Sequence, residues 1–334
     1  MINNSGDIVL NPLSQDCRPS VSVAMGTYNG SRFLGEQLYS LASQELLPCE
    51  LVICDDGSKD ETAQVIADFA RTAPFEVRFI QNPACLGIAK NFEKAIMLCR
   101  GDIIAICDQD DFWNPQKLAR CVESLEADPT LGGVFSDAEL IDHDSAPLGQ
   151  RLWASVPFRP AKDRLSSAEF VRLLLKQNVA TAPTIVFRSP WRDTIVPIPT
   201  TWMQDAWIMW MLALYSSVGF VREPLVRYRV HPNQQIGVAA KTPMARFRKA
   251  HRAGNAAYGD LALRFEDLRE KMLAHPIPTQ AQYLRDLERR IHLLNLQARL
   301  PDSRIKRAVQ MIPALPSYMR YTRGLVTICR DLLV

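Results

Sequence analysis

The amino-acid sequence predicts an α/β fold with a mostly parallel central sheet, helices on both faces of that sheet, and a helical C-terminal region. Short, unbroken apolar runs alternate with helix-like segments through the first part of the chain, which is typical of parallel strands buried on both faces. Beyond residue 240 the pattern is helical throughout. We therefore expect an N-terminal extension at residues 1–19, an α/β domain at 20–240 and a helical region at 241–334.

The first four expected strands are apolar runs at residues 21–25, 50–54, 76–80 and 102–107. Helical spacing follows the first run, and a Ser-Lys-Asp-Glu capping box opens a helix after the second. Later helices are expected at 88–99, from Pro115, at 166–177 and from Asp205, with strands at 184–187 and 225–230. In such a sheet, ligands gather at the carboxyl ends of the strands.

The composition is that of an ordinary globular protein, with 47% hydrophobic and 22% charged residues among 334. The first twenty residues have neither a basic start nor an apolar run, so we expect no signal peptide and a cytoplasmic protein. The longest apolar stretch, residues 206–221, is shorter than the roughly 20 residues of a membrane span, so we expect a buried helix followed by a turn there. The eight scattered cysteines are expected to be reduced thiols.

Polar residues follow three of the expected strands. Residues 26–30 read Gly-Thr-Tyr-Asn-Gly, in which a glycine can let a ligand approach the backbone and the tyrosine can stack on a base. Residues 55–58 read Asp-Asp-Gly-Ser, in which a carboxylate can accept the imide N–H of uracil or thymine; a simple turn and helix cap is the alternative. Residues 108–111 hold three carboxylates, which suit Mg²⁺ or Mn²⁺ with substrate phosphates; a solvated acidic turn is the alternative.

The order of these loops resembles one known family. The stretches VSVAMGTYNG, CDDGSKDET, NPACLGIAKNF and GDIIAICDQDDFWNPQKL are similar to family 2 glycosyltransferases of the GT-A fold. The stretches DQDDFW, QDAW and YRVHPNQQIG resemble a bacterial branch described as rhamnosyltransferases of surface polysaccharides. The resemblance covers roughly residues 20 to 240. It implies transfer of a sugar from a nucleotide diphosphate sugar to an acceptor hydroxyl, with inversion at the anomeric carbon.

The resemblance also implies a role for individual residues. Asp205 would be the catalytic base. The nucleotide would contact Gly26, Thr27, Tyr28, Asp56, Lys90 and Asp108. Asp108 and Asp110 form an Asp-x-Asp motif that would hold Mg²⁺ or Mn²⁺ together with His231 of the YRxH motif, and Asp110 would be the direct ligand. Trp113 and Asp137 would line the donor sugar.

Several alternatives stay open at this stage. Asp56 reads uracil and thymine alike, so the donor is a UDP- or dTDP-sugar, and a UDP-hexose or UDP-N-acetylhexosamine transferase competes with a rhamnosyltransferase. A nucleotidyltransferase would carry a Gly- and Arg-rich loop after the first strand, where this chain has Gly-Thr-Tyr-Asn-Gly. A non-catalytic sugar- or lipid-binding subunit is a third possibility, against which the intact Asp108, Asp110 and Asp205 argue.

The C-terminal region differs in charge from the rest. Residues 1–240 hold 21 basic and 28 acidic residues, a balance of −7, and residues 241–334 hold 18 and 8, a balance of +10. The basic helices would either pack as a bundle or dock peripherally on anionic lipid at the inner face of the cell membrane, close to a glycan or lipid-linked glycan acceptor. In the second case Tyr318 and Leu325 would lie at the lipid interface, beside Arg320, Arg323 and Arg330. No motif accompanies the charge that would indicate nucleic-acid binding.

Overall fold

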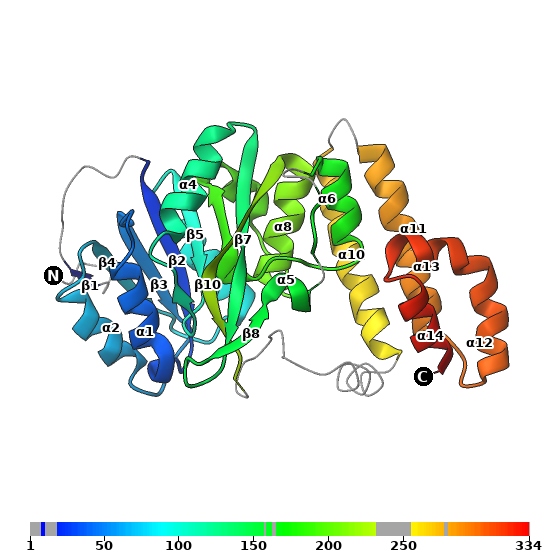
Figure 1. The fold of residues 1–334 in the computed structure, drawn as a ribbon, viewed down its shortest axis with the longest axis horizontal. Coiled ribbons are helices and arrows are strands. Elements are labelled where there is room, and N and C mark those ends of the chain that lie inside the picture. The colour runs from blue at the N-terminus through cyan, green and yellow to red at the C-terminus, as the bar shows by residue number, and fades with distance from the viewer. Residues whose placement is uncertain are drawn as a thin grey trace. The chain divides into compact units, whose positions relative to one another are not determined.

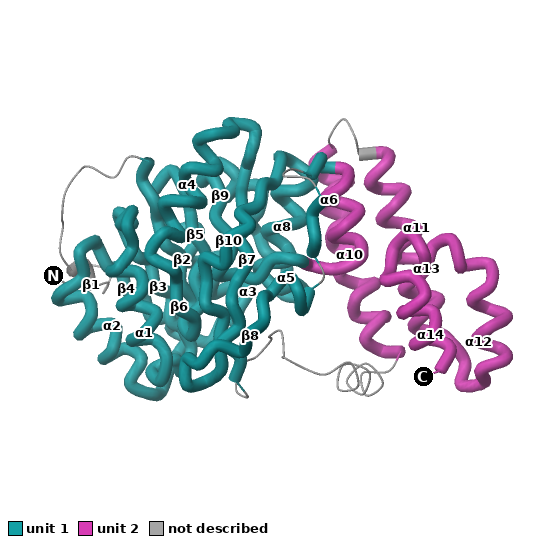
Figure 2. Tube along the Cα trace, in the orientation of Figure 1, with its two compact units in different colours: residues 1–167, 179–238 teal, residues 168–178, 239–334 magenta. Residues whose placement is uncertain are grey.

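The computed structural model describes residues 8–10, 19–156, 158–161, 165–231, 255–276 and 280–333 (Figure 1). The chain divides into two compact units, one of residues 1–167 and 179–238 and the other of residues 168–178 and 239–334 (Figure 2). The second unit therefore takes a short segment, 168–178, from within the expected 20–240 domain. The motif residues after His231 and the start of the basic region, residues 241–254, lie outside the described residues.

The first unit is built on one mixed sheet, which has ten strands among the described residues. Its order is β1 (Ile8–Leu10), β4 (Glu76–Gln81), β3 (Glu50–Asp55), β2 (Val21–Thr27), β5 (Ile103–Cys107), β9 (Ile185–Arg188), β7 (Leu131–Ile141), β10 (Ser217–Arg229) and β6 (Phe112–Trp113), with β8 (Pro147–Arg151) beside β7. Strands β4, β3, β2 and β5 are parallel, as are β7 and β10. This confirms the mostly parallel sheet. Strand β1 lies in the expected extension and pairs antiparallel with β4.

The principal helices of this unit are α1 (Ser31–Ala42), α2 (Thr62–Ala70), α3 (Ile88–Leu98), α4 (Lys117–Ala127) and α8 (Gln204–Tyr215). Helix α3 packs on β2 and β3, and α4 packs on β7 and β10. The buried helix expected in the apolar stretch at 206–221 is α8, which ends at Tyr215, and the strand β10 begins two residues later. Among the described residues, no helix has both the length and the apolar character needed to cross a bilayer.

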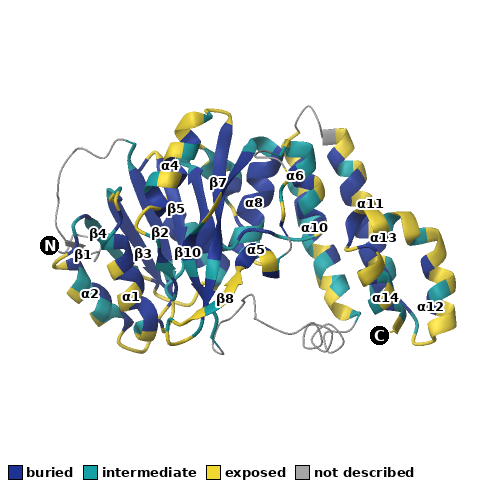
Figure 3. Ribbon diagram, in the orientation of Figure 1, coloured by how far each residue is buried: buried dark blue, intermediate teal, exposed yellow. Residues whose placement is uncertain are grey.

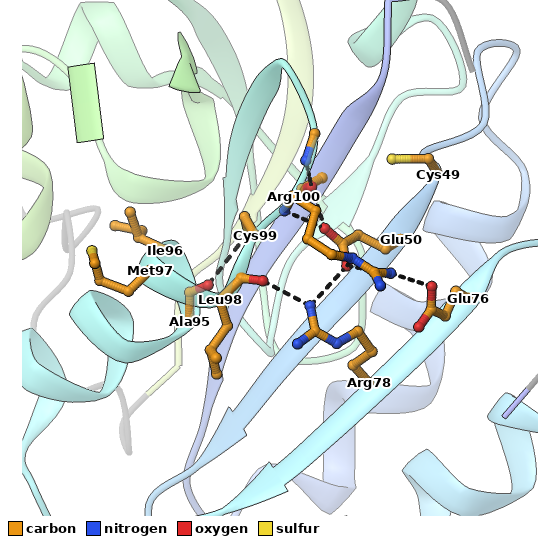
Figure 4. Close-up of polar contacts among 12 residues, drawn as sticks. Cys49, Glu50, Glu76, Arg78, Ala95, Ile96, Met97, Leu98, Cys99 and Arg100 are labelled. Atoms are coloured by element: carbon orange, nitrogen blue, oxygen red, sulfur yellow. Dashed lines mark hydrogen bonds and ion pairs between the residues drawn. The ribbon is translucent and has the colours of Figure 1, made fainter. Parts of the chain in front are cut away.

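A buried carboxylate anchors the amino-terminal end of β3 (Figure 4). Glu50 accepts hydrogen bonds from Ser22 Oγ at 2.6 Å, from Arg100 N at 2.6 Å and from Arg78 Nη1 at 3.0 Å. Arg78 also donates to the Leu98 carbonyl at the last residue of α3, at 2.7 Å, where a helix leaves carbonyls without partners. One charged network thus ties β2, β3 and β4 to the end of α3, at the strand ends opposite the acidic loop.

The second unit is helical. It contains most of α6 (Ser167–Leu174), together with α10 (Ala256–Ala274), α11 (Gln280–Ala298), α12 (Arg304–Met311), α13 (Leu315–Tyr321) and α14 (Leu325–Leu333). Helices α10 and α11 pack along one another, and buried residues such as Leu268, Leu287 and Leu294 form their core. Helix α14 contacts both α12 and α13. The C-terminal helical region is therefore confirmed, and its helices bury a core of their own.

Candidate active site

The loop after β2 is held by the middle residue of the Asp-x-Asp motif. The backbone N–H of Tyr28 donates to Gln109 Oε1 at 2.9 Å, and Gln109 Nε2 donates back to the Tyr28 carbonyl at 3.1 Å. A Cβ atom on Gly30 would lie 2.2 Å from Gln109 Oε1, so a larger residue there would displace the Gln109 amide from its bonds to Tyr28. Gln109 was not among the expected site residues. Its amide joins two loops that the nucleotide and the cation would contact, and it leaves the Tyr28 ring exposed.

Gly26 and Thr27 serve the fold rather than presenting side-chain positions to a ligand. A Cβ atom on Gly26 would lie 3.0 Å from the Phe92 ring of α3, so close helix packing explains this glycine and the expected ligand approach does not. Thr27 is buried, and its hydroxyl donates to Asp55 Oδ2 at 2.9 Å. Both residues can still contribute backbone atoms to a nucleotide site.

Asp56 follows β3 and is saturated by donors from the segment before α3. Oδ1 accepts the N–H of Leu86 at 2.7 Å and Asn82 Nδ2 at 3.0 Å, while Oδ2 accepts the N–H of Gly87 at 2.9 Å and Cys85 Sγ at 3.0 Å. Burial alone would raise the pKa of Asp56, but these bonds outweigh it and lower the pKa from 3.8. A pyrimidine N3–H must therefore displace one donor, and the thiol is the weakest of the four.

The other expected nucleotide contact, Lys90, lies in the first turn of α3. Its Nζ is 2.7 Å from Glu93 Oε2, one turn further along the same helix. The ion pair leaves Lys90 about one-third exposed, so a phosphate could compete with Glu93 for it.

Acidic side chains converge after β5. Burial, followed by the charges of Asp110 and Asp205, raises the pKa of Asp108 well above 3.8. Asp111 is fully buried; its Oδ1 accepts the N–H of Arg229 at 2.9 Å, and its Oδ2 has no hydrogen-bond partner. Such crowding suits a cation. Among the described residues, however, no three His, Cys, Asp or Glu side chains are arranged to hold a metal ion. A cation here would take one or two carboxylates and complete its shell with phosphate and water.

The end of β10 braces this acidic loop. His231 Nε2 lies 2.9 Å from Asp110 Oδ2. Arg229 is fully buried and donates to the Asp110 carbonyl, to Ser145 Oγ and to Glu36 Oε2, each at 2.8 Å. Arg229 was missed as a site residue. The available signal was an arginine inside a run that otherwise predicts a buried strand.

Asp205 opens α8 beside the same cluster. Burial raises its pKa from 3.8 to about 6, while a hydrogen bond from the N–H of Ala206 opposes the rise. Its charge also contributes to the raised pKa of Asp108, which places the two carboxylates in one electrostatic group. A carboxylate with a pKa near 6 is ionised at neutral pH and is a stronger base than an ordinary aspartate.

Two expected donor-sugar residues do not reach an open surface, and we correct their assignment. Trp113 is fully buried, with Lys117 Nζ 3.5 Å from the centroid of its ring. Asp137 is also buried, and its Oδ1 accepts the N–H groups of Ala138 and Trp153 at 2.8 and 3.0 Å. Both side chains are buried, although Trp113 lies on the edge strand β6 and Asp137 on the interior strand β7.

Polar and acidic loops thus lie at the carboxyl ends of β2, β3 and β5, which is where a mostly parallel α/β sheet binds ligands. Residues 22–166 match the model of glycosyl transferase family 2, and the chain carries a domain of that family. An uncharacterized glycosyltransferase of Nostoc sp. is 28% identical over 229 residues, which cover 66% of this chain and 68% of the relative.

Two solved structures share the fold. S. aureus TarS 1–349 in complex with UDP-GlcNAc matches with a TM-score of 0.60 and 16% identity, over 94% of this chain and 88% of that one. The mannosyltransferase PcManGT of Pyrobaculum calidifontis, in complex with GDP-Man and Mn²⁺, matches with a TM-score of 0.54 and 19% identity, over 90% and 76%. The protein is therefore a glycosyltransferase, and its first unit has the GT-A fold.

Proposed function

We propose that the protein is an inverting, metal-dependent glycosyltransferase. It moves a sugar from a pyrimidine nucleotide diphosphate sugar to the hydroxyl of a glycan or lipid-linked glycan in bacterial surface polysaccharide synthesis. The observation that carries this proposal is the pairing of Asp205, whose pKa is about 6, with the acidic loop at Asp108 and Asp110. A base and a cation-binding loop in one group are what a single displacement needs.

In this mechanism Asp205 accepts the proton of the acceptor hydroxyl as its oxygen forms a bond to the anomeric carbon. The bond from that carbon to the diphosphate breaks in the same step, and its electron pair leaves with the diphosphate. Asp108 and Asp110, with His231 beside them, would hold Mg²⁺ or Mn²⁺, which neutralises charge on the leaving group. Arg229 keeps the Asp110 backbone in place through its 2.8 Å bond.

The nucleotide would sit on the loops after β2 and β3. Tyr28 offers an exposed ring for base stacking, and Asp56 offers a carboxylate whose thiol partner a base N–H can replace. This supports UDP or dTDP over ADP, because adenine lacks an imide N–H. The rhamnosyl donor rests on the resemblance of the DQDDFW, QDAW and YRVH stretches. A UDP-N-acetylhexosamine donor is the second candidate, which the shared fold of TarS with bound UDP-GlcNAc favours.

A donor-hydrolysis screen tests the proposal without knowledge of the acceptor. Purified protein is incubated with UDP-, dTDP- and GDP-sugars, with Mn²⁺, with Mg²⁺ or with excess chelator, and released nucleotide is measured. We expect slow release from one UDP- or dTDP-sugar, only with a cation, and none from Asp110→Asn. Equal release from GDP-sugars would refute the pyrimidine site, and full release with chelator would refute the metal requirement.

We also propose that the protein works at the inner face of the cell membrane, in peripheral contact through residues 241–334. The basic balance of this region, +10, supports attraction to anionic lipid.

A further inference from the structure

The last helix of the second unit exposes apolar side chains and buries polar ones, the reverse of an ordinary surface helix. Helix α14 exposes Leu325 and Val326 to 68% each and Leu333 to 53%, together with Cys329. Its buried residues are the polar Thr327 and Asp331. Surface helices normally bury their apolar stripe and expose their polar one. The apolar side of α14 therefore faces outward.

Specific hydrogen bonds hold this orientation in place. Asp331 Oδ1 accepts Tyr258 OH at 2.5 Å, and Asp331 Oδ2 accepts Gln297 Nε2 at 2.6 Å and Tyr318 OH at 3.0 Å. The Asp331 carbonyl accepts Arg307 Nη1 at 3.0 Å. Rotating α14 to bury its leucines would break these bonds and leave buried polar groups without partners, which is costly. The outward apolar side is thus built into the unit.

The neighbouring helix α12 repeats the arrangement. It exposes Ile305 to 79% and Val309 to 63%, and Ile312 follows directly after its end at 62%. These residues are spaced i, i+4 and i+7 and form one stripe. Arg307, in contrast, is buried and donates to the Pro301 carbonyl as well as to Asp331. Figure 3 shows the exposed positions along α12.

Positive charge borders the stripe. Arg304 and Lys306 are exposed and flank Ile305 in sequence, so each lies about 100° around the helix from it. Residues 303–330 contain six basic residues and no acidic residue. Of the six, Arg304, Lys306 and Arg323 are exposed, whereas Arg307 is buried and the other two are bonded to aspartates. A partner for this surface must therefore be apolar at its centre and negative at its edge.

We propose that the outward faces of α12 and α14, here called the apolar faces, dock into the headgroup region of an anionic lipid bilayer. Apolar side chains bounded by Arg and Lys are the surface that binds in the plane of such a bilayer. A second copy of the chain fits less well, because a two-fold interface would bring the same positive residues together. This proposal identifies the contact surface within residues 241–334 and is independent of the donor and the reaction.

Vesicle co-sedimentation of the full-length protein tests the proposal. One set of vesicles contains phosphatidylglycerol and phosphatidylcholine in equal parts, and the other contains phosphatidylcholine alone. We expect binding to the anionic vesicles at low salt, weakened by added salt, and little binding to the neutral ones. Absence of binding to anionic vesicles at low salt would overturn the proposal.

Two variants separate the apolar and the charged contributions. The triple variant Ile305→Gln, Val309→Gln, Ile312→Gln should lose binding by at least about tenfold. The double variant Arg304→Gln, Lys306→Gln should bind less tightly and with a smaller salt dependence. These side chains are exposed, so circular dichroism should show an unchanged fold.

The matched control is Leu263→Gln, an apolar residue of α10 in the same unit that is 64% exposed and outside the apolar faces. It should bind vesicles as the wild type does. Equal loss in the control and the triple variant would overturn the assignment of the surface. Light scattering tests whether a second copy of the chain covers the apolar faces. If the wild type is a dimer, and the triple variant is a monomer that still binds vesicles, the faces form a dimer interface instead.

Discussion

The raised pKa of Asp205 leads to a quantitative prediction about pH. At a pKa of about 6, about nine-tenths of this carboxyl is ionised at pH 7 and about one-tenth at pH 5. Because a general base works only when ionised, kcat/KM should fall about tenfold between pH 7 and pH 5. A carboxyl with the ordinary pKa of 3.8 would lose less than about a tenth of its ionised form over the same range. The profile therefore separates the two cases.

A bound cation should lower the pKa of Asp205, which gives a second test of the same prediction. Asp205 belongs to one electrostatic group with Asp108, so a divalent cation bound at the acidic loop would stabilise the ionised form of Asp205. The midpoint of the acid limb should then move to lower pH as the concentration of Mn²⁺ is raised. Steady-state rates measured from pH 5 to pH 8, at low and at saturating Mn²⁺, test this. If the midpoint of the acid limb did not change with the Mn²⁺ concentration, the cation would bind elsewhere.

Replacement of the base completes the test. Asp205→Asn should lower kcat by about 10²–10⁴-fold and remove the acid limb, while nucleotide affinity stays nearly unchanged. The matched control is Asp193→Asn, because Asp193 is also an aspartate in the first turn of a helix, α7 (Arg192–Ile195), and is exposed. If Asp205→Asn kept kcat within a few-fold of wild type, Asp205 would be a residue favoured only by the helix dipole, and its role as base would be withdrawn.

Four further predictions concern the acidic loop, the arginine beside it, the nucleotide and the buried Glu50. Asp110→Asn should abolish transfer and Mn²⁺-dependent nucleotide binding with little change in melting temperature, measured by calorimetry. Arg229→Lys should raise the Mn²⁺ concentration for half-maximal activity by about tenfold, because lysine cannot bond to the Asp110 carbonyl while also bonding to Ser145 and Glu36. UDP or dTDP should raise the melting temperature more than ADP, which lacks a ring N–H for Asp56, and more than GDP, and equal shifts would contradict a pyrimidine site. Glu50→Gln should lower the free energy of unfolding by about 3 kcal/mol at pH 7, and the exposed control Asp68→Asn should not. The difference should disappear as the pH falls below the lowered pKa of Glu50.

The first four strands could be predicted because their apolar runs are short, unbroken and bounded by turn residues. The structure places β2, β3, β4 and β5 within two residues of the expected runs. Strand β7 (Leu131–Ile141) was not predicted, since its sequence carries two glycines and the polar Ser136, Asp137 and Glu139. Those polar residues are accommodated by packing and backbone hydrogen bonds, which periodicity does not report. The position of β9, antiparallel between β5 and β7, also depends on tertiary packing that the local sequence does not report.

The site shows the same division. The acidic loop carries a local signal, because three carboxylates follow an apolar strand, whereas Asp205 was named only through the family resemblance; both roles stay predictions. Gln109 and Arg229 were not, because their roles depend on partners 81 and 119 residues away in sequence. Gly26 shows a further limit: the sequence offers ligand approach as a reason for this glycine, and only the structure shows the Phe92 ring 3.0 Å from where a Cβ would lie.

The C-terminal helices show why periodicity alone does not settle which face points inward. The sequence predicts amphipathic helices there, and the lipid interpretation expected both Tyr318 and Leu325 at the interface. Leu325 is exposed, but Tyr318 is fully buried with its hydroxyl on Asp331. Arg320 and Arg330 are likewise occupied, bonded to Asp286 and Asp331. A buried carboxylate with several donors outweighs the burial of a few leucines, because unpaired polar groups in an interior cost more than exposed apolar area. The same carboxylate therefore explains both the buried tyrosine and the leucines that remain available to a bilayer.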